Sequence, residues 1–68
     1  RIEEAIKLFK LNVEAYPGAF NVYDSLGEAF MEQGQFGLAV ENYRRSLELN
    51  PENSNAREKL EELKMNNR

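Results

Sequence analysis

The 68-residue sequence contains no cysteine, no histidine and no tryptophan. Without cysteine, neither a disulfide framework nor a thiolate zinc site can stabilise so short a chain. Without histidine or cysteine, the serines lack a base that would turn them into nucleophiles. The glycines also lack the spacing of a phosphate-binding loop. The sequence therefore predicts no catalytic residue, no metal site and no cofactor, and its function is expected to reside in a surface.

Basic charge and long apolar runs are scarce as well. Nine Lys and Arg residues stand against twelve Asp and Glu residues, giving a net charge of -3, and the basic residues are scattered. This distribution argues against a nucleic-acid partner, because nucleic-acid modules gather basic side chains on one face. The apolar stretches are only a few residues long, which argues against a membrane span or signal peptide. The chain begins with Arg1 and is interpreted as a segment of a longer protein.

An internal repeat of 34 residues is the main positive feature of the sequence. Pro17 returns as Pro51, and Ala5 returns as Ala39. Further pairs at the same separation are Phe9 and Tyr43, Val13 and Leu47, and Glu14 and Glu48. A fixed period of this size is typical of solenoids, in which each unit buries its apolar face against its neighbours.

Apolar residues at three- and four-residue steps predict amphipathic helices over about 1–16, 20–33 and 36–49. Gly34 and the prolines at 17 and 51 are expected to end them, and Asn53 or Ser54 can cap a fourth helix. Loops of two to five residues force successive helices to lie antiparallel. The predicted fold is all-α, an antiparallel helix-turn-helix array of about four helices followed by a polar tail at 66–68.

Seven positions carry a resemblance to a known family. The run Tyr23-x2-Leu26-Gly27-x2-Phe30, then Ala39-x3-Tyr43 and Pro51, resembles the tetratricopeptide repeat (TPR), with Tyr23 where that family prefers tryptophan. The resemblance implies an α-solenoid fragment that serves as a non-catalytic scaffold for protein binding. It also implies three parts: residues 1–17 as the second helix of a preceding repeat, 18–51 as one full helical hairpin, and 52–68 as a polar C-terminal capping helix and tail.

Small residues in this pattern predict a close approach of two helices. Gly27 is expected opposite Ala39, and the space around this contact is expected to be filled by the aromatic side chains of Tyr23, Phe30, Phe36 and Tyr43. Asn12 and Ser46 occupy positions where the family usually has alanine, so each polar group should be either hydrogen-bonded or exposed.

In the fourth helix, charged residues replace the apolar positions of the second. The residues 34 positions after Tyr23, Gly27 and Phe30 are Arg57, Glu61 and Lys64. This change predicts a charged terminal face, as the last repeat of a solenoid requires.

The resemblance further implies a concave groove lined by the first helix of each repeat, where peptides or partner helices dock. The expected groove residues are Asn21, Asp24, Ser25, Glu28, Met31, Glu32, Asn55 and Glu58, joined by Lys59 and Glu62. Because carboxylates dominate, the partner should be a neutral or basic protein or peptide. The alternative for Asp24, Glu28 and Glu32 is a solvated acidic face, and the alternative for Asn55 is a role at the helix start.

The first helix is apolar over most of its circumference. Beside its core stripe it carries Leu8 and Leu11, and we expect Ile2, Ile6 and Phe9 to lack part of their cover. The sequence allows two interpretations: docking against an upstream domain or a second copy, or single exposed leucines. The segment also resembles the C-terminal repeats attached to some bacterial serine hydrolases and esterases. The alternative function is therefore a structural appendage of an upstream hydrolase-type enzyme.

Overall fold

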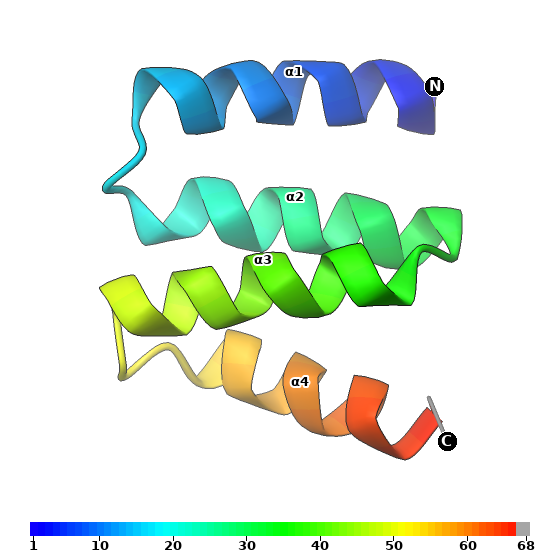
Figure 1. Cartoon of the computed structure of the whole chain (residues 1–68), viewed down its shortest axis with the longest axis vertical. Helices are drawn as coiled ribbons and strands as arrows, with labels where there is room; N and C mark the ends of the chain where they lie inside the picture. The colour runs from blue at the N-terminus through cyan, green and yellow to red at the C-terminus, as the bar shows by residue number, and fades with distance from the viewer. Residues whose placement is uncertain (67–68) are drawn as a thin grey trace.

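The computed structural model describes residues 1–66 and consists of four helices arranged side by side in chain order (Figure 1). Residues 1–66 contain no strand, which confirms the all-α prediction. The tail expected at 66–68 lies outside the described residues, except for the backbone of Asn66. The helices are α1 (Ile2–Ala15), α2 (Phe20–Gln33), α3 (Phe36–Leu49) and α4 (Ser54–Asn66).

The connections between the helices explain where each helix ends. At the end of α2, Gly34 has φ 84°, a left-handed conformation that glycine adopts without steric cost. The N–H of Gly34 donates to the carbonyl of Met31 at 3.0 Å, and that of Gln35 donates to the carbonyl of Phe30 at 2.9 Å. At the start of α4, Asn53 Oδ1 accepts the N–H of Ala56 at 3.3 Å, so Asn53 is the capping residue.

Each helix packs against the helix before it and the helix after it, so α2 and α3 are the central pair. The molecule measures 32 × 28 × 14 Å, so it is thinnest in one direction. Its core consists of Ile6, Leu26, Ala29, Phe30, Ala39, Tyr43, Ala56 and Leu63. Every helix of this described part is too short or too polar to cross a membrane.

The closest neighbour of Gly27 is Tyr43 rather than Ala39. A Cβ atom built on Gly27 would lie 3.1 Å from Cδ2, Cε2 and Cζ of the Tyr43 ring. Tyr43 lies one helical turn beyond Ala39 on α3, and the absence of a side chain at position 27 lets the ring lie against α2. The structure supports the prediction of a close approach at Gly27, and the side chain nearest to it is Tyr43, which was expected beside this contact.

Two expectations about packing were wrong. Phe36 is 41% exposed; it is the first residue of α3 and directly follows the connection from α2. Ile6 is only 6% exposed, because α2 covers it and it joins the core. Ile2 and Phe9 are partly buried against the same core, whereas Leu8 and Leu11 are 62% and 58% exposed.

Candidate functional site

The predicted groove residues all come from α2 and α4, but they differ in burial. The exposed members are Asn21, Glu28, Glu32, Asn55 and Glu58. Asp24, Ser25 and Met31 are half-buried, and Met31 packs against the core. Ser25 donates its hydroxyl to the carbonyl of Asn21 at 3.1 Å within its own helix. Ser25 and Met31 therefore contribute less free surface than the sequence predicted.

Asp24 belongs to a polar network that links α2, α3 and α4. Its Oδ2 atom accepts from Asn53 Nδ2 at 2.9 Å, and the same amide nitrogen donates to Ser46 Oγ at 2.8 Å. The Ser46 hydroxyl in turn donates to the carbonyl of Phe20 at 3.1 Å. The interpretation of Asp24 as part of a solvated acidic face was therefore wrong, because its carboxylate is held by a neighbouring element. Ser46 is buried and fully hydrogen-bonded, whereas Asn12, its counterpart one repeat earlier, is exposed.

The side chain of Tyr43 is fully buried. Burial raises the pKa of Tyr43 well above its ordinary value, and the charges of Glu28, Asp24 and Glu62 raise it further. The phenol is therefore neutral at physiological pH. Neither its hydroxyl oxygen nor Asp24 Oδ1 has a hydrogen-bond partner within residues 1–66.

Sequence reasoning did not assign a functional role to Tyr43 or Asn53. Tyr43 was expected only as a packing residue, and Asn53 only as a helix cap. The cap is Asn53, so the helix-start alternative for Asn55 finds no support in the structure. The signal that could have located the network is the polar Ser46 in a small-residue position, because a buried hydroxyl requires a partner. Among residues 1–66, no three His, Cys, Asp or Glu side chains are grouped so that they could hold a metal ion.

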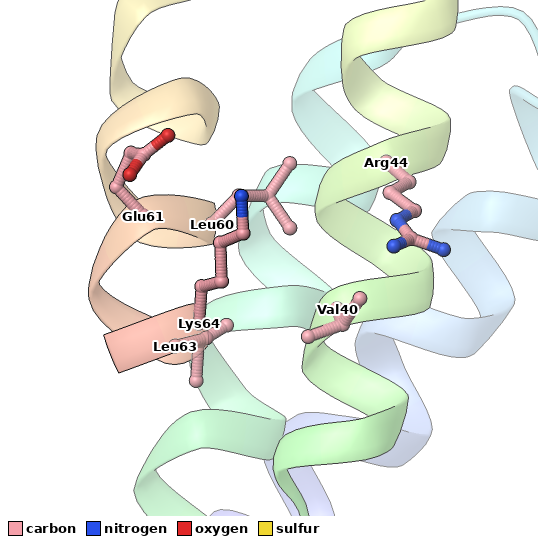
Figure 2. Close-up of a pocket in the computed structure, with 6 residues that line it drawn as sticks. All are labelled: Val40, Arg44, Leu60, Glu61, Leu63 and Lys64. Atoms are coloured by element: carbon pink, nitrogen blue, oxygen red, sulfur yellow. The ribbon is translucent and has the colours of Figure 1, made fainter. Parts of the chain in front are cut away.

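Two shallow grooves flank the central helices. One, of about 280 Å³, lies between α1 and α2 and is lined by Ile2, Ala5, Phe9, Ser25, Glu28, Ala29 and Glu32. The other, of about 380 Å³, lies between α3 and α4 and is lined by Val40, Arg44, Leu60, Glu61, Leu63 and Lys64 (Figure 2). The second groove includes Glu61 and Lys64, which were expected to form a charged terminal face. This groove is also lined by Val40, Leu60 and Leu63. The charged side chains of α4 therefore lie beside apolar ones.

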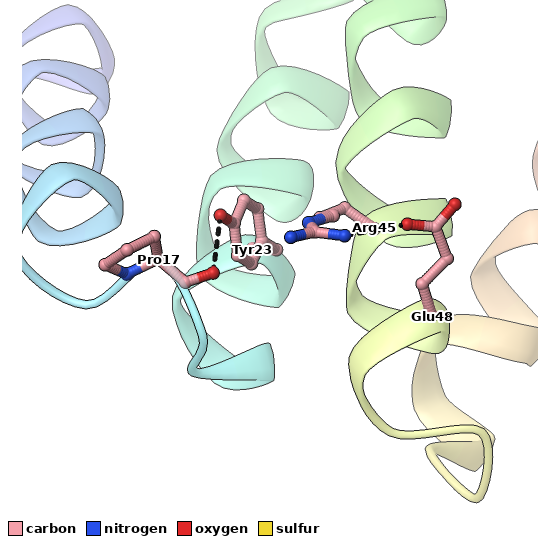
Figure 3. Close-up of polar contacts among 4 residues, drawn as sticks. All are labelled: Pro17, Tyr23, Arg45 and Glu48. Carbon is pink, nitrogen blue, oxygen red and sulfur yellow. Dashed lines mark hydrogen bonds and ion pairs between the residues drawn. The ribbon is translucent and has the colours of Figure 1, made fainter.

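Tyr23 links the loop after α1 to α2 and α3 (Figure 3). Its hydroxyl donates to the carbonyl of Pro17 at 2.9 Å, and the guanidinium of Arg45 lies 5.8 Å from the centre of its ring. Arg45 also forms an ion pair of 2.9 Å with Glu48, and this contact, followed by that with Tyr23, raises the pKa of Arg45. These contacts give Tyr23 a packing role where two connected repeats meet.

An array of antiparallel helices with a 34-residue internal repeat defines a helical-repeat protein. Residues 27–62, just over half of the chain, match the family model described as TPR repeat. The chain belongs to the TPR repeat family. Repeats of this family are generally non-catalytic motifs for protein–protein interaction, and they typically bind proteins or peptides.

The chain is also similar to Superkiller complex protein 3 of Homo sapiens. The two are 35% identical over 49 residues, which cover 72% of this chain but only 3% of the human protein. This chain therefore corresponds to a small part of that relative. The name of this relative describes a protein of a complex, which agrees with the family's general role in protein interaction.

Proposed function

We propose that this chain is a non-catalytic protein-binding module whose acidic face binds a peptide or partner helix of neutral or basic chemistry. The acidic face is defined as Asn21, Asp24, Ser25, Glu28, Met31, Glu32, Asn55, Glu58 and Glu62. The observation that carries the proposal is that the carboxylates of Glu28 and Glu32 on α2 and of Glu58 and Glu62 on α4 are exposed.

Charge balance on this face supports a cationic partner. Lys59 Nζ lies 3.9 Å from Glu62 Oε1, whereas neither Asp24 nor Glu28 has an ion-pair partner in the described part of the chain. Unpaired carboxylates near one another repel, and an incoming basic group relieves that repulsion while also speeding the encounter. An acidic ligand would add to the repulsion.

The proposal is tested by titrating the labelled chain with two capped peptides of equal length, one rich in lysine and one rich in glutamate, followed by NMR. We expect the basic peptide to bind, and its affinity to fall between about 50 mM and about 300 mM NaCl, because salt screens exposed charges. Glu28→Lys should weaken binding, whereas Glu41→Lys, an exposed change on α3, serves as the matched control. Equal or tighter binding of the acidic peptide at the higher salt concentration would refute the proposal.

A second candidate function is that of a structural C-terminal appendage of an upstream hydrolase-type enzyme, docked through Leu8 and Leu11. The exposure of these two leucines on one helix favours it. The two candidates differ in what precedes Arg1 in the full-length protein. A nucleophile motif upstream supports the appendage, whereas further helical repeats support the binding module.

A further inference from the structure

The groove between α3 and α4 combines apolar lining residues with unpaired charges (Figure 2). Apolar side chains from both helices line it, and these are Val40, Leu60 and Leu63. Its charged lining residues are all exposed, and these are Arg44, Glu61 and Lys64. None of the three charges forms an ion pair in the described part of the chain. The α3–α4 groove, defined by these six residues, therefore offers apolar contact together with two positive charges and one negative charge.

The exposed leucines of α1 are flanked by charges of the opposite balance. Leu8 and Leu11 lie three residues apart, so they are neighbours on one side of the helix. The charged residues three or four positions from these leucines are Glu4, Lys7 and Glu14. All three are exposed, and none has an ion-pair partner among residues 1–66. The leucine face, defined by these five residues of α1, thus carries two negative charges and one positive charge.

Charge favours the α3–α4 groove over the other surfaces that could cover these leucines. The groove between α1 and α2 is lined by Glu28 and Glu32 and has no basic lining residue, so it would repel the leucine face. A contact between two α1 helices would bring together two faces of the same net negative charge. The α3–α4 groove has a net positive charge and apolar lining residues, so it complements the leucine face in both respects.

We propose that the leucine face of α1 binds in the α3–α4 groove of a second copy of this chain. Since α1 and α4 lie at opposite ends of the array (Figure 1), one copy presents both surfaces at the same time. A contact between two different surfaces leaves one free leucine face and one free groove on every pair. Further copies therefore add to the pair, and the assembly grows head to tail instead of stopping at a closed dimer.

Apolar contact and charge have different roles in this association. Val40 and Leu60 are only partly buried within one copy, so covering Leu8 and Leu11 removes apolar surface from water on both sides of the contact. The charges around the two surfaces select the partner and its orientation. None of the acidic-face residues lines this groove, so the inference goes beyond the proposed function and does not depend on it.

The test uses sedimentation velocity with the 68-residue chain and two variants, each of which disables one surface. Leu11→Glu keeps the groove intact, and the double variant Arg44→Glu with Lys64→Glu keeps the leucine face intact. All three positions are exposed, so helix content measured by circular dichroism should not change. Between about 10 µM and about 1 mM the unchanged chain should grow beyond a dimer, and each variant alone should associate at least about tenfold more weakly.

A mixture of the two variants distinguishes this contact from one between two α1 helices. Leu11→Glu supplies an intact groove, and the double variant supplies an intact leucine face. The mixture should therefore form a heterodimer with about the affinity of the unchanged contact, and it should not grow further, because the two remaining surfaces are disabled. A contact between α1 helices predicts instead that the double variant associates with itself as strongly as the unchanged chain.

Reversing the charges on the leucine face as well should restore association. Glu4→Lys and Glu14→Lys, added to the double variant, give a basic leucine face and an acidic groove, so the two surfaces are complementary again. The same two lysine substitutions in a chain with the original groove serve as the control, and they should weaken association. Substitutions that act only by destabilising the fold would not produce this recovery.

Three outcomes overturn the proposal. The first is a monomer of the unchanged chain over the whole concentration range, and the second is unchanged association of the double variant. The third is a mixture that stays monomeric although both variants keep their helix content. Because the groove and the acidic face share no residue, loss of association with basic-peptide binding retained refutes this inference alone. Association without binding of a basic peptide refutes the proposed function alone.

Discussion

Asn53 is the residue that joins the last three helices. Its amide nitrogen donates to Asp24 on α2 and to Ser46 on α3, and its oxygen caps α4. The side chain is buried, so none of these bonds can be replaced readily by water. One amide group thus forms hydrogen bonds to α2, α3 and α4, at the place where the full repeat ends and α4 begins.

Replacing Asn53 is therefore expected to destabilise the protein. Asn53→Ala should lower the free energy of unfolding by about 2 kcal/mol, because it removes a helix cap and leaves buried partners unsatisfied. Urea denaturation followed by circular dichroism measures this change. Asn55→Ala is the control, since Asn55 is exposed two residues further on and its loss should change stability by no more than about 0.5 kcal/mol. Equal losses in the two variants would contradict the role of the network.

Sequence reasoning located the members of this network but not the network itself. The polar residue in a small-residue position identified Ser46, and helix-start chemistry identified Asn53. The bonds that connect them to α2 span 26 and 29 residues of sequence. A periodic pattern describes neighbours within a helix and one repeat away, so it cannot specify which polar atoms meet across helices.

At the scale of the elements, α2 and α3 are locked together by the contact of Gly27 with Tyr43. Gly27→Leu is expected to destabilise the protein by about 1–3 kcal/mol, because the fully buried ring cannot give way to a branched side chain. Thermal unfolding measures the effect.

Gly37→Ala provides the control for this substitution. Nothing lies within 4 Å of a Cβ atom added at Gly37, which is also in a helix, so the change should be neutral or stabilising by up to about 1 kcal/mol. An unchanged melting temperature in Gly27→Leu would show that the ring is free to move.

The helix boundaries of α2 and α3 could be predicted because strong local signals set them. Gly34 takes the one backbone conformation that favours glycine, and Pro51 follows directly after the residue that caps α3. Phe36 was misjudged because periodicity placed it on the apolar stripe. Periodicity states which side of a helix a residue occupies, but not whether another element extends far enough to cover it. The division of the chain into parts at 1–17, 18–51 and 52–68 stays a prediction.

At the scale of the whole molecule, α1 presents two exposed leucines on the outer side of the array. Burying an exposed leucine contributes roughly 1.5–3 kcal/mol, so a second copy that covers Leu8 and Leu11 gains appreciable free energy. We expect a concentration-dependent dimer or larger assembly, measured by sedimentation velocity. Because Ile6 is already buried against α2, the contact should involve the outward side of α1 alone.

Leu11→Glu should shift this assembly toward monomer. Leu38→Glu is the matched control, because Leu38 is a partly exposed leucine on α3 that lies outside the proposed contact. A monomer at high micromolar concentration, together with no effect of Leu11→Glu, would rule out self-association through α1.

Because most packing is between helices adjacent in the chain, the fold also affects how the molecule acquires and loses its structure. Contacts between neighbours in sequence close only short loops, so folding should be fast, as it is for other helical proteins of low contact order. The central pair of helices has the most extensive contact, whereas α1 and α4 are each held from one side. Amide hydrogens of α2 and α3 should therefore exchange most slowly, while the outer helices open first, as in a linear array of weakly cooperative units.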